Sequence, residues 1–591
     1  MRFIENYRTV WPLMAEHRRG LATGLGFLVL TNVFTFVAPW ILKIAIDDLQ
    51  AGIDVSRLLT YCGFIVAAAC LQGVFRFAMR LYIIGISRDI EYVLRNRILR
   101  HLLNLPVSFF GTMRTGDVMS RVTSDIEAVR MAIGPGAMHM ANTSATFLAA
   151  LTSMLLLHPG LTLYALLPTP VVAFLMYYSA RFYHKRFLAV QEQRAWLNTA
   201  AQENFSGIRV VKSYNQEAFQ AERFAAGSRD YMRRNLDLAR SLGFFHPLVG
   251  MVAGTGTLIV LWAGGGLVIR GEITLGTLVA FMGFLALLIW PTIALGWVVT
   301  LIQRGSAALG RINGILHTAP EEQEIPDAVP LAPAGPGTAV EARSLAFTYP
   351  GREDPVLRDI SFTIRPGEKV ALVGRTGSGK STLLHLLPRL RPVPDGSLFV
   401  DGTDINRLRL DDLRAHLGFV PQETFLFTQS LQENITFDAG EDPDAPRLPV
   451  EEAAALARLA ADVDDLPDGY GTVVGERGVT LSGGQKQRTA IARALHRRPR
   501  LLILDDALSA VDARTEEEIL DGIFSGDQGR TVIIVSHRLS TVRRAERILV
   551  LDEGRLVESG SHEELLASAG GCYRTLVERQ ILAEELEQER H

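Results

Sequence analysis

Long stretches without a charged residue, all within the first 303 residues, constrain the fold of the chain more than any other feature. They cover residues 20–42, 58–75, 131–180, 241–269 and 273–303. A helix of roughly 20 apolar residues crosses the hydrocarbon core of a bilayer. The third run is long enough for two crossings, and His158-Pro159-Gly160 within it is a natural turn. Such a concentration of uncharged runs is hard to bury in a soluble core, so the sequence predicts a membrane domain.

We expect six transmembrane helices whose long connections lie on the cytoplasmic side. The helices are predicted near residues 20–46, 58–80, 131–157, 161–180, 241–269 and 273–303. The first, third and fifth connections are short, whereas the second and fourth are long and rich in arginine. Arginine-rich loops face the cytoplasm, which places both termini there and the protein in the cytoplasmic (inner) membrane. Helical patterns continue over residues 88–103 and 190–224, so long helical extensions should reach into the cytoplasm.

The second half of the chain has a different character. Proline, glycine and acidic residues dominate residues 316–338, a composition typical of a linker. Further on, short apolar runs at 369–373, 501–504 and 531–535 alternate with helical patterns, as in an α/β domain. We therefore predict three regions: a membrane domain over residues 1–315, a linker over 316–338 and an α/β domain over 339–591.

Composition narrows the possible partners. The 60 basic and 63 acidic residues leave a net charge of −3, so no basic excess points to nucleic acid. The three cysteines cannot build a disulfide framework, and their spacing matches no zinc pattern. The apolar runs make membrane lipid the partner that the composition itself requires.

A phosphate-binding loop follows the apolar run at 369–373. The loop fits the pattern G-x-x-x-x-G-K-[ST] between a strand pattern and a helix pattern, which is the context that the motif requires. Its residues are Gly374, Arg375, Thr376, Gly377, Ser378, Gly379, Lys380, Ser381 and Thr382. Glycines let backbone N–H groups turn inward on a phosphate at the positive end of a helix. We expect Lys380 to contact the β- and γ-phosphates and Ser381 to offer its hydroxyl to Mg²⁺.

Two adjacent carboxylates end the apolar run at 501–504. A carboxylate at the end of a buried strand can orient Mg²⁺ through its water shell, and we assign this role to Asp505. Asp506 occupies the next position, where a general base or a water-orienting group would sit.

The run Leu-Ser-Gly-Gly-Gln-Lys-Gln-Arg at 481–488 resembles the signature motif of ATP-binding cassette (ABC) proteins. The resemblance implies that Ser482, Gly483, Gly484 and Gln485 contact ATP held by a partner chain. Further elements occur in the family's order: Tyr349 resembles the aromatic residue that stacks on adenine, Gln422 the Q-loop glutamine, residues 475–478 a loop of exporters, Asp512 the D-loop and His537 the switch histidine.

The resemblance covers the whole chain, because six spans followed by one cassette is the layout of an ABC exporter half-transporter of the multidrug and lipid-flippase type. It implies an all-α polytopic membrane domain followed by an α/β P-loop nucleotide-binding domain. It also implies a dimer that encloses two ATP molecules, with Mg²⁺ held by Ser381, Gln422 and Asp505. ATP would drive the export of a hydrophobic or amphipathic substrate (drug-like, lipid or peptide) by alternating access. Motion would pass through residues 106–111 and 211–216. An ATP-gated channel or regulatory subunit is the alternative.

One residue departs from the family's pattern. The family usually has glutamate after the Mg²⁺ aspartate, whereas this chain has Asp506. Its carboxylate should fall about 1.5 Å short at fixed backbone geometry, and misplacement on the order of 1 Å can cost about 10²-fold in rate. We therefore expect a heterodimer. Asp506 would mark a degenerate ATP site, and this chain's signature would complete the competent site of a second half-transporter that carries the glutamate. A homodimer with slow hydrolysis is the alternative.

Candidate substrate contacts in the membrane domain are harder to assign from the sequence. They are Asn142, Trp262, Phe281, Trp290 and Trp297. Aromatic residues in membrane helices are more often interface anchors or packing residues than ligand contacts.

Overall fold

The computed structural model divides the chain into two compact units, which we describe separately. The structure describes residues 5–320, 328–331, 335–437, 447–475, 478–525 and 529–588. Two stretches of the expected linker, 321–327 and 332–334, lie outside the described residues. The first unit contains Met1–Leu103 and Arg114–Ala319, and the second contains Asn104–Met113 and Pro320–His591.

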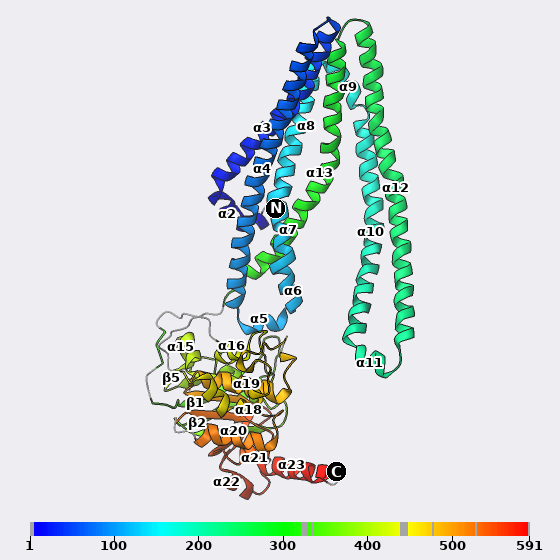
Figure 1. Cartoon of the computed structure of the whole chain (residues 1–591). Helices are drawn as coiled ribbons and strands as arrows, with labels where there is room; N and C mark the ends of the chain where they lie inside the picture. The colour runs from blue at the N-terminus through cyan, green and yellow to red at the C-terminus, as the bar shows by residue number, and fades with distance from the viewer. Residues whose placement is uncertain are drawn as a thin grey trace. The chain divides into compact units, whose positions relative to one another are not determined.

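Six helices of the first unit are long and apolar enough to cross a membrane (Figure 1). Four of them are single continuous helices: α3 (Arg18–Gln50), α4 (Val55–Leu103), α12 (Glu217–Ile269) and α13 (Leu275–Leu316). The third spanning helix joins α6 (Thr115–Ser120), η2 (Arg121–Asp125), α7 (Ile126–Met131), η3 (Ala132–Gly136) and α8 (Ala137–Leu157). The fourth joins α9 (Pro159–Leu166) and α10 (Thr169–Ser206). Two short elements precede them, η1 (Tyr7–Thr9) and α2 (Trp11–Glu16).

Several of these helices are far longer than a bilayer requires. Helix α4 has 49 residues, which at the usual rise per residue makes it roughly 70 Å long. The hydrocarbon core is only about 30 Å thick, so about half of α4 extends beyond it. The extension follows the predicted span 58–80 and carries most of the charged residues of α4, because charged side chains are costly in the apolar layer.

Helices α10 and α12 lie side by side and are joined at one end by α11 (Ile208–Ser213), as Figure 1 shows. The sequence predicted helical segments over residues 190–224, with the turn of this inner loop near residues 211–216. The break at Asn215 falls in that range, whereas the break after Ser206 was not predicted. The helix ends at Ser206, and a second break follows α11 at Asn215, which has a left-handed backbone with φ of 51°. Glycine at 207 and asparagine at 215 are residues that commonly end helices.

Ion pairs connect α13 to η2 and α4 to α7. The guanidinium of Arg311 donates two hydrogen bonds, of 2.8 and 2.5 Å, to the carboxylate of buried Asp125. Buried Glu91 accepts from Arg95 at 2.6 Å and lies 3.3 Å from the Nε of Arg130. Glu91 and Arg130 are both buried, and removing one partner of such a pair costs about 3–5 kcal/mol. Arg311 is half exposed, so its pair with Asp125 contributes less.

The second unit is built on two β-sheets. The larger has the strand order β10-β9-β3-β8-β7-β6, in which every neighbouring pair except β10–β9 is parallel. Its strands are β3 (Lys369–Gly374), β6 (Leu417–Val420), β7 (Leu501–Asp505), β8 (Thr531–Val535), β9 (Arg547–Asp552) and β10 (Arg555–Gly560). The smaller sheet has the order β2-β1-β4-β5 and contains β1 (Val340–Phe347), β2 (Leu357–Ile364), β4 (Leu398–Val400) and β5 (Thr403–Asp404). The expected fold class, a helical membrane domain followed by an α/β domain, is confirmed.

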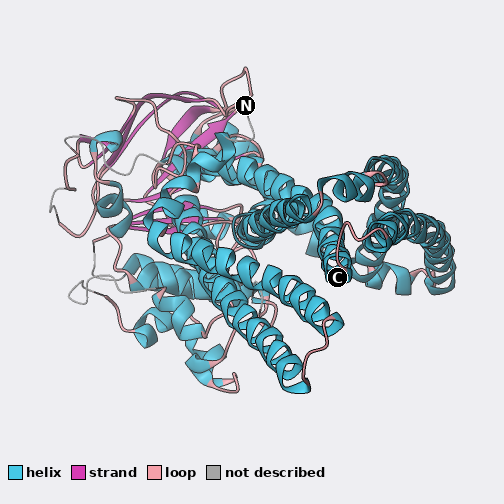
Figure 2. Cartoon of the chain, turned by 90° about the horizontal axis from the view of Figure 1, so that it is seen from above, coloured by secondary structure: helices cyan, strands magenta, loops and turns pink. Residues whose placement is uncertain are grey.

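Helices cover the strands of this unit, which are magenta in Figure 2. Alternate residues of β3 enter two different apolar cores, Ala371 and Val373 on one face and Val370 and Leu372 on the other. The helices are α14 (Lys380–Leu386), α15 (Leu410–Ala415), α16 (Leu431–Thr436), α17 (Val450–Leu456), α18 (Ala460–Asp464), α19 (Gly483–His496), α20 (Ala513–Ser525), α21 (Leu539–Val542), α22 (His562–Ala567) and α23 (Cys572–Gln588), with short turns η4 (Ile405–Arg407) and η5 (Gly469–Gly471).

The carboxyl ends of β3, β8 and β7 are neighbours in the larger sheet. A ligand site is expected at such an edge.

The short helix α5 (Val107–Thr112) belongs to the second unit, although it follows α4 directly in the chain. It contains Phe109 and Phe110, whose rings meet edge to face at 5.4 Å. The other segment expected to transmit motion, residues 211–216, belongs to the first unit.

Candidate functional site

The loop between β3 and α14 is shaped by glycines that no other residue could replace without strain. Gly374 has a φ of 153°, and a Cβ atom there would lie 2.1 Å from the carbonyl oxygen of Leu551. Gly379 has a φ of 101°, and a Cβ atom would lie 2.7 Å from a methyl carbon of Leu357. These close approaches let the loop fold tightly against β9 and β2 before α14 begins at Lys380.

Lys380 is buried inside this loop. Its Nζ donates to the carbonyl oxygens of Gly374 at 2.8 Å and Arg375 at 2.9 Å. Burial lowers the pKa of Lys380, and the nearby carboxylates of Asp505 and Asp506 act in the opposite direction. A phosphate beside Lys380 would add negative charge and favour the ammonium form further.

Two hydroxyl groups of the loop have different surroundings, and one of them suits a metal ion. The Oγ of Ser378 is buried and has no hydrogen-bond partner among the described residues, and buried polar atoms rarely lack one. Ser381 hydrogen-bonds Asp505, whose pKa is raised by burial and lowered by Ser381 and His385. The Oγ of Ser378 lies beneath the loop beside Gly374 and does not line the nucleotide cavity. A hydroxyl paired with a carboxylate at a strand end fits Mg²⁺, a hard cation that prefers oxygen ligands.

Asp506 sits on a tightly held piece of backbone. Its N–H donates to the carbonyl oxygen of Val535 at 3.1 Å, and its own carbonyl oxygen accepts from the hydroxyl of Ser509 at 3.0 Å. Its φ is 49°, a left-handed conformation that aspartate adopts more readily than most residues. The side chain of Gln422 donates from Nε2 to Oδ2 of Asp506 at 3.4 Å. The Cα position of Asp506 is therefore set by the backbone, and side-chain length decides where its carboxylate lies.

Tyr349 forms an aromatic wall at the opposite end of the loop. Its ring meets Phe347 edge to face at 5.1 Å, and the guanidinium carbon of Arg391 lies 5.4 Å from the ring centre. Its hydroxyl is 3.0 Å from that of Thr382, which directly follows Ser381 in α14. The arrangement holds a flat apolar face at a fixed place beside the loop.

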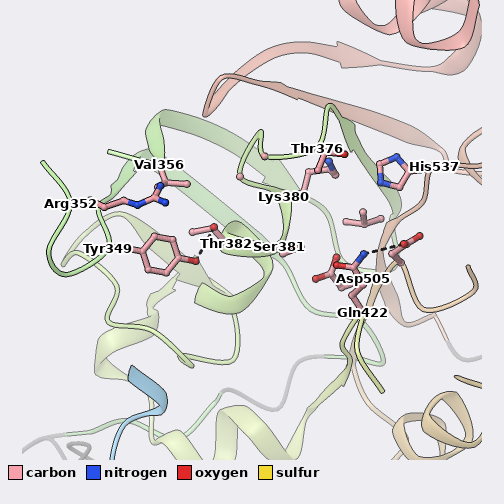
Figure 3. A pocket seen from close by; sticks show the side chains of 14 residues that line it. Tyr349, Arg352, Val356, Thr376, Lys380, Ser381, Thr382, Gln422, Asp505 and His537 are labelled. Atoms are coloured by element: carbon pink, nitrogen blue, oxygen red, sulfur yellow. Dashed lines mark hydrogen bonds between the residues drawn. The ribbon is translucent and has the colours of Figure 1, made fainter. Parts of the chain in front are cut away.

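A cavity of about 490 Å³ brings most of these residues together (Figure 3). Eleven of the residues singled out from the sequence line it: Tyr349, Thr376, Gly377, Gly379, Lys380, Ser381, Thr382, Gln422, Asp505, Asp506 and His537. Sequence reasoning missed the three other lining residues, Arg352, Val356 and Val535. A basic residue just after Tyr349-Pro350-Gly351 was a usable signal for Arg352, and Val535 ends an apolar run that was recognised as a strand.

The signature motif lies outside this cavity, at the start of α19. Ser482 caps the helix: its Oγ accepts from the N–H of Gln485 at 3.2 Å, and its own N–H donates to that side chain at 2.9 Å. A Cβ atom on Gly484 would lie 3.0 Å from the carbonyl oxygen of Ala510, so the helix start packs closely on the segment after Asp506. Within the described part of this chain, Ser482, Gly483, Gly484 and Gln485 do not line the Lys380 cavity.

Other residues singled out from the sequence are also placed away from the cavity. Asp512 accepts from the N–H of Thr515 at 2.9 Å, and this hydrogen bond lowers the pKa of Asp512. Gly374, Arg375 and Ser378 belong to the phosphate loop but do not line the cavity themselves. Glu476 and Arg477, within the run 475–478, lie outside the described residues.

The candidate substrate contacts differ in how far their side chains are exposed. Phe281 is fully buried in the core between α8, α9, α12 and α13 and packs against apolar neighbours. The side chain of Asn142 accepts a hydrogen bond from Asn32 at 3.1 Å. Trp262, Trp290 and Trp297 are at least about half exposed in the single chain, at 82%, 64% and 47%. The ring of Trp297 contacts His139, with 5.3 Å between centres.

Both domains of this chain match the sequences of known protein families. Residues 21–292 match the family "ABC transporter transmembrane region", and residues 357–509 match the family "ABC transporter". The chain is 40% identical to the probable multidrug resistance ABC transporter ATP-binding/permease protein YheI of Bacillus subtilis, over 94% of each chain. It is 36% identical to the multidrug resistance-like ATP-binding protein MdlA of Escherichia coli, over 98% of this chain and 97% of that protein.

A solved structure has the same architecture. It is a bacterial Atm1-family ABC exporter with ATP bound, 29% identical, with a TM-score of 0.77 over 95% of this chain and 98% of that one. The phosphate loop, the capped signature helix and the six spanning helices occur in the order typical of one family. The chain therefore belongs to the ABC transporters, as an exporter that carries its membrane domain and its nucleotide-binding domain in one polypeptide.

Proposed function

We propose that this exporter works as one half of a heterodimer with two unlike ATP sites, and that it moves a hydrophobic or amphipathic substrate out of the cytoplasm. The substrate class comprises drug-like molecules, lipids and peptides. The protein would lie in the cytoplasmic membrane with both termini and the nucleotide-binding domain in the cytoplasm. The observation that carries the asymmetry is Asp506, on a backbone held by Val535 and Ser509, where the family has glutamate.

Each residue of the Lys380 cavity has a role in this proposal. Tyr349 would stack on adenine, and Lys380 with the loop amides would hold the phosphates. Ser381, Gln422 and Asp505 would hold Mg²⁺, which neutralises charge on the phosphates when bound. His537 would sense the γ-phosphate. Asp506 would be too short to orient the attacking water well, so this site would bind ATP and hydrolyse it slowly or not at all.

The signature supports the second half of the proposal. The family's signature is matched by Ser482, Gly483, Gly484 and Gln485. The side chains of Ser482 and Gln485 cap the start of this helix, each accepting a hydrogen bond from the other's backbone N–H. Because the signature does not line its own chain's cavity, we infer, as the family resemblance implies, that it would act on ATP bound by another chain. Loss of the glutamate together with an intact signature fits a chain that completes a competent site elsewhere while its own site is weakened.

The composition of the purified transporter tests this proposal. A tagged copy of the chain, extracted in mild detergent from cells that make it naturally, should bring down a second half-transporter in a 1:1 ratio. That chain should carry glutamate after its Mg²⁺ aspartate. Recovery of this chain alone, as an active homodimer, would overturn the heterodimer. Transport of labelled drugs, lipids and peptides into inside-out vesicles would then identify the substrate class.

Nucleotide binding should weaken as the pH falls, because Asp505 becomes protonated. Burial raises the pKa of this carboxyl, so it takes up a proton at a higher pH than an ordinary aspartate. Mg²⁺ requires the ionised form, and the Mg²⁺-dependent part of the affinity should therefore fall as the pH drops through that raised pKa. Calorimetric titration with Mg²⁺ and a non-hydrolysable ATP analogue would measure it.

The variant Asp505→Asn provides the control for this prediction. It should lose most of the Mg²⁺-dependent affinity and also the pH dependence due to Asp505, while the titration of the nucleotide's own phosphates stays the same in both proteins. Identical pH profiles for the two proteins would show that Asp505 does not control metal binding.

A further inference from the structure

A second cavity, of about 390 Å³, lies within the membrane domain between α8, α9, α10, α12 and α13. Its volume falls within the range of about 300–1,000 Å³ that is usual for small-molecule sites. The walls are almost entirely apolar, and the polar side chains among the lining residues are Thr169, Ser179, Tyr183 and Thr257. A cavity of this kind suits a hydrocarbon chain.

One face of α10 contributes five residues to the lining of the cavity. Thr169, Val172, Met176, Ser179 and Tyr183 all line it and follow one another at intervals of three or four residues. Such intervals place side chains on the same face of a helix. The next position of this stripe, three residues beyond Tyr183, is Arg186. The apolar stripe therefore leads to a cation.

Arg186 connects α10 to α12 through hydrogen bonds to neutral groups, so the positive charge of its guanidinium is not balanced by these contacts. Its guanidinium donates to the carbonyl oxygen of Asp237 at 2.8 Å and to the hydroxyl of Ser241, and it lies 4.3 Å from the ring centre of Phe182. Ser241 directly precedes Leu242, which lines the cavity. Within the described part of the chain, no carboxylate lies at ion-pair distance from Arg186; the side chain of Asp237 is paired with Arg240 instead.

The surroundings of Arg186 are strongly basic and aromatic. Arg181 and Lys185 are close to it on α10, and residues 159–191 contain no acidic residue. The ring of Phe245, which lines the cavity, contacts Phe182 at 5.7 Å and Tyr183 at 5.8 Å. Aromatic residues together with unpaired cations at the end of an apolar stripe are typical of the level of lipid headgroups.

We propose that this cavity binds an anionic phospholipid of the cytoplasmic leaflet. One acyl chain would lie along the α10 stripe, and the phosphate would accept hydrogen bonds from Arg186 and Tyr183. Basic pockets between membrane helices on the cytoplasmic side bind anionic headgroups in this way. The leaflet follows from the topology proposed above. The site itself depends neither on the asymmetry of the ATP sites nor on the exported substrate.

Photolabelling in vesicles tests the site. The purified transporter would be placed in phosphatidylcholine vesicles that contain a trace of phosphatidylglycerol with a photoreactive acyl chain, and labelled peptides would be mapped. We expect label on residues 169–183 and 242–257, and competition by unlabelled phosphatidylglycerol but not by additional phosphatidylcholine. Equal competition by both lipids would overturn the anionic specificity, and label elsewhere only would overturn the site.

Two pairs of variants separate the headgroup contact from the cavity. Arg186→Gln should reduce the labelling by about fivefold, the effect of one basic residue at a membrane surface. Arg194→Gln, an exposed arginine further along α10, should leave it unchanged. Gly250→Leu should abolish labelling, because Gly250 lines the cavity and a Cβ atom there meets no other atom within 4 Å. Gly254→Leu is equally open but does not line the cavity, so it should label normally. Unchanged labelling in Gly250→Leu would refute the proposal.

Discussion

Ser482→Ala should reduce the ATPase rate of the intact transporter by about 10²-fold, the effect of losing one hydrogen-bond donor to a reacting group. In our account the Ser482 hydroxyl acts on the ATP molecule that the partner chain binds and hydrolyses. The rate of steady-state phosphate release by the purified, reconstituted transporter measures the effect. Nucleotide affinity of this chain's own site should change little, because Ser482 is not part of the Lys380 cavity.

Loss of a helix cap could imitate this result, and the chain offers a matched control. Ser482 begins α19 with a capping box, and Ser561 begins α22 with the same reciprocal pair. Each serine contributes about 1 kcal/mol to its helix. Ser561→Ala should therefore lower stability to a similar degree and leave the ATPase rate nearly unchanged. Equal loss of ATPase activity in both variants would mean that Ser482 acts only as a cap.

Among glycine-to-alanine substitutions in the nucleotide-binding domain, we expect Gly374→Ala to reduce stability the most. The added Cβ would lie 2.1 Å from the carbonyl oxygen of Leu551, and the φ of 153° is unfavourable for alanine. Clash and backbone strain together should lower the free energy of unfolding by about 3 kcal/mol and abolish ATP binding by the loop. Thermal unfolding of the purified transporter and binding of a fluorescent ATP analogue would measure the two effects.

The variant Gly377→Ala measures the cost of an unfavourable backbone conformation without the steric clash that Gly374→Ala adds. Gly377 also has a positive φ, of 84°, but a Cβ atom there would meet nothing within 4 Å. Only the conformational cost of about 1 kcal/mol applies. The Gly377 variant should remain folded and bind the analogue more weakly than the unaltered protein. If Gly374→Ala were as stable as Gly377→Ala, the close packing of the loop on β9 would be wrong.

The features that sequence reasoning predicted well are local ones. A membrane helix is marked by a long absence of charge, and the phosphate loop by glycines at fixed spacing beside Lys380, so neither depends on distant parts of the chain. Helix interruptions are also local: the turn near residues 211–216 was expected, whereas the break at Gly207 was missed. The continuing apolar periodicity on both sides of the break concealed it.

The features that could not be predicted depend on residues far apart in the sequence. Gln422 and Asp506 are 84 positions apart, and their hydrogen bond follows from the order of the strands in the sheet. The left-handed backbone of Asp506 depends on its bond to Val535 in β8. The cavity beside α10 requires five elements to pack together, and no periodic pattern in one helix reveals the space between several.

The ATPase rate of the intact transporter carrying Asp506→Asn tests the central claim most directly. Asparagine keeps the size of the side chain and its bond to Gln422 can be maintained, while the negative charge is lost. If Asp506 belongs to a degenerate site, the rate should stay close to that of the unaltered transporter, whereas replacing the partner's catalytic glutamate should nearly abolish it. A loss of about 10²-fold or more in the Asp506→Asn transporter would contradict the account and identify Asp506 as a working catalytic residue.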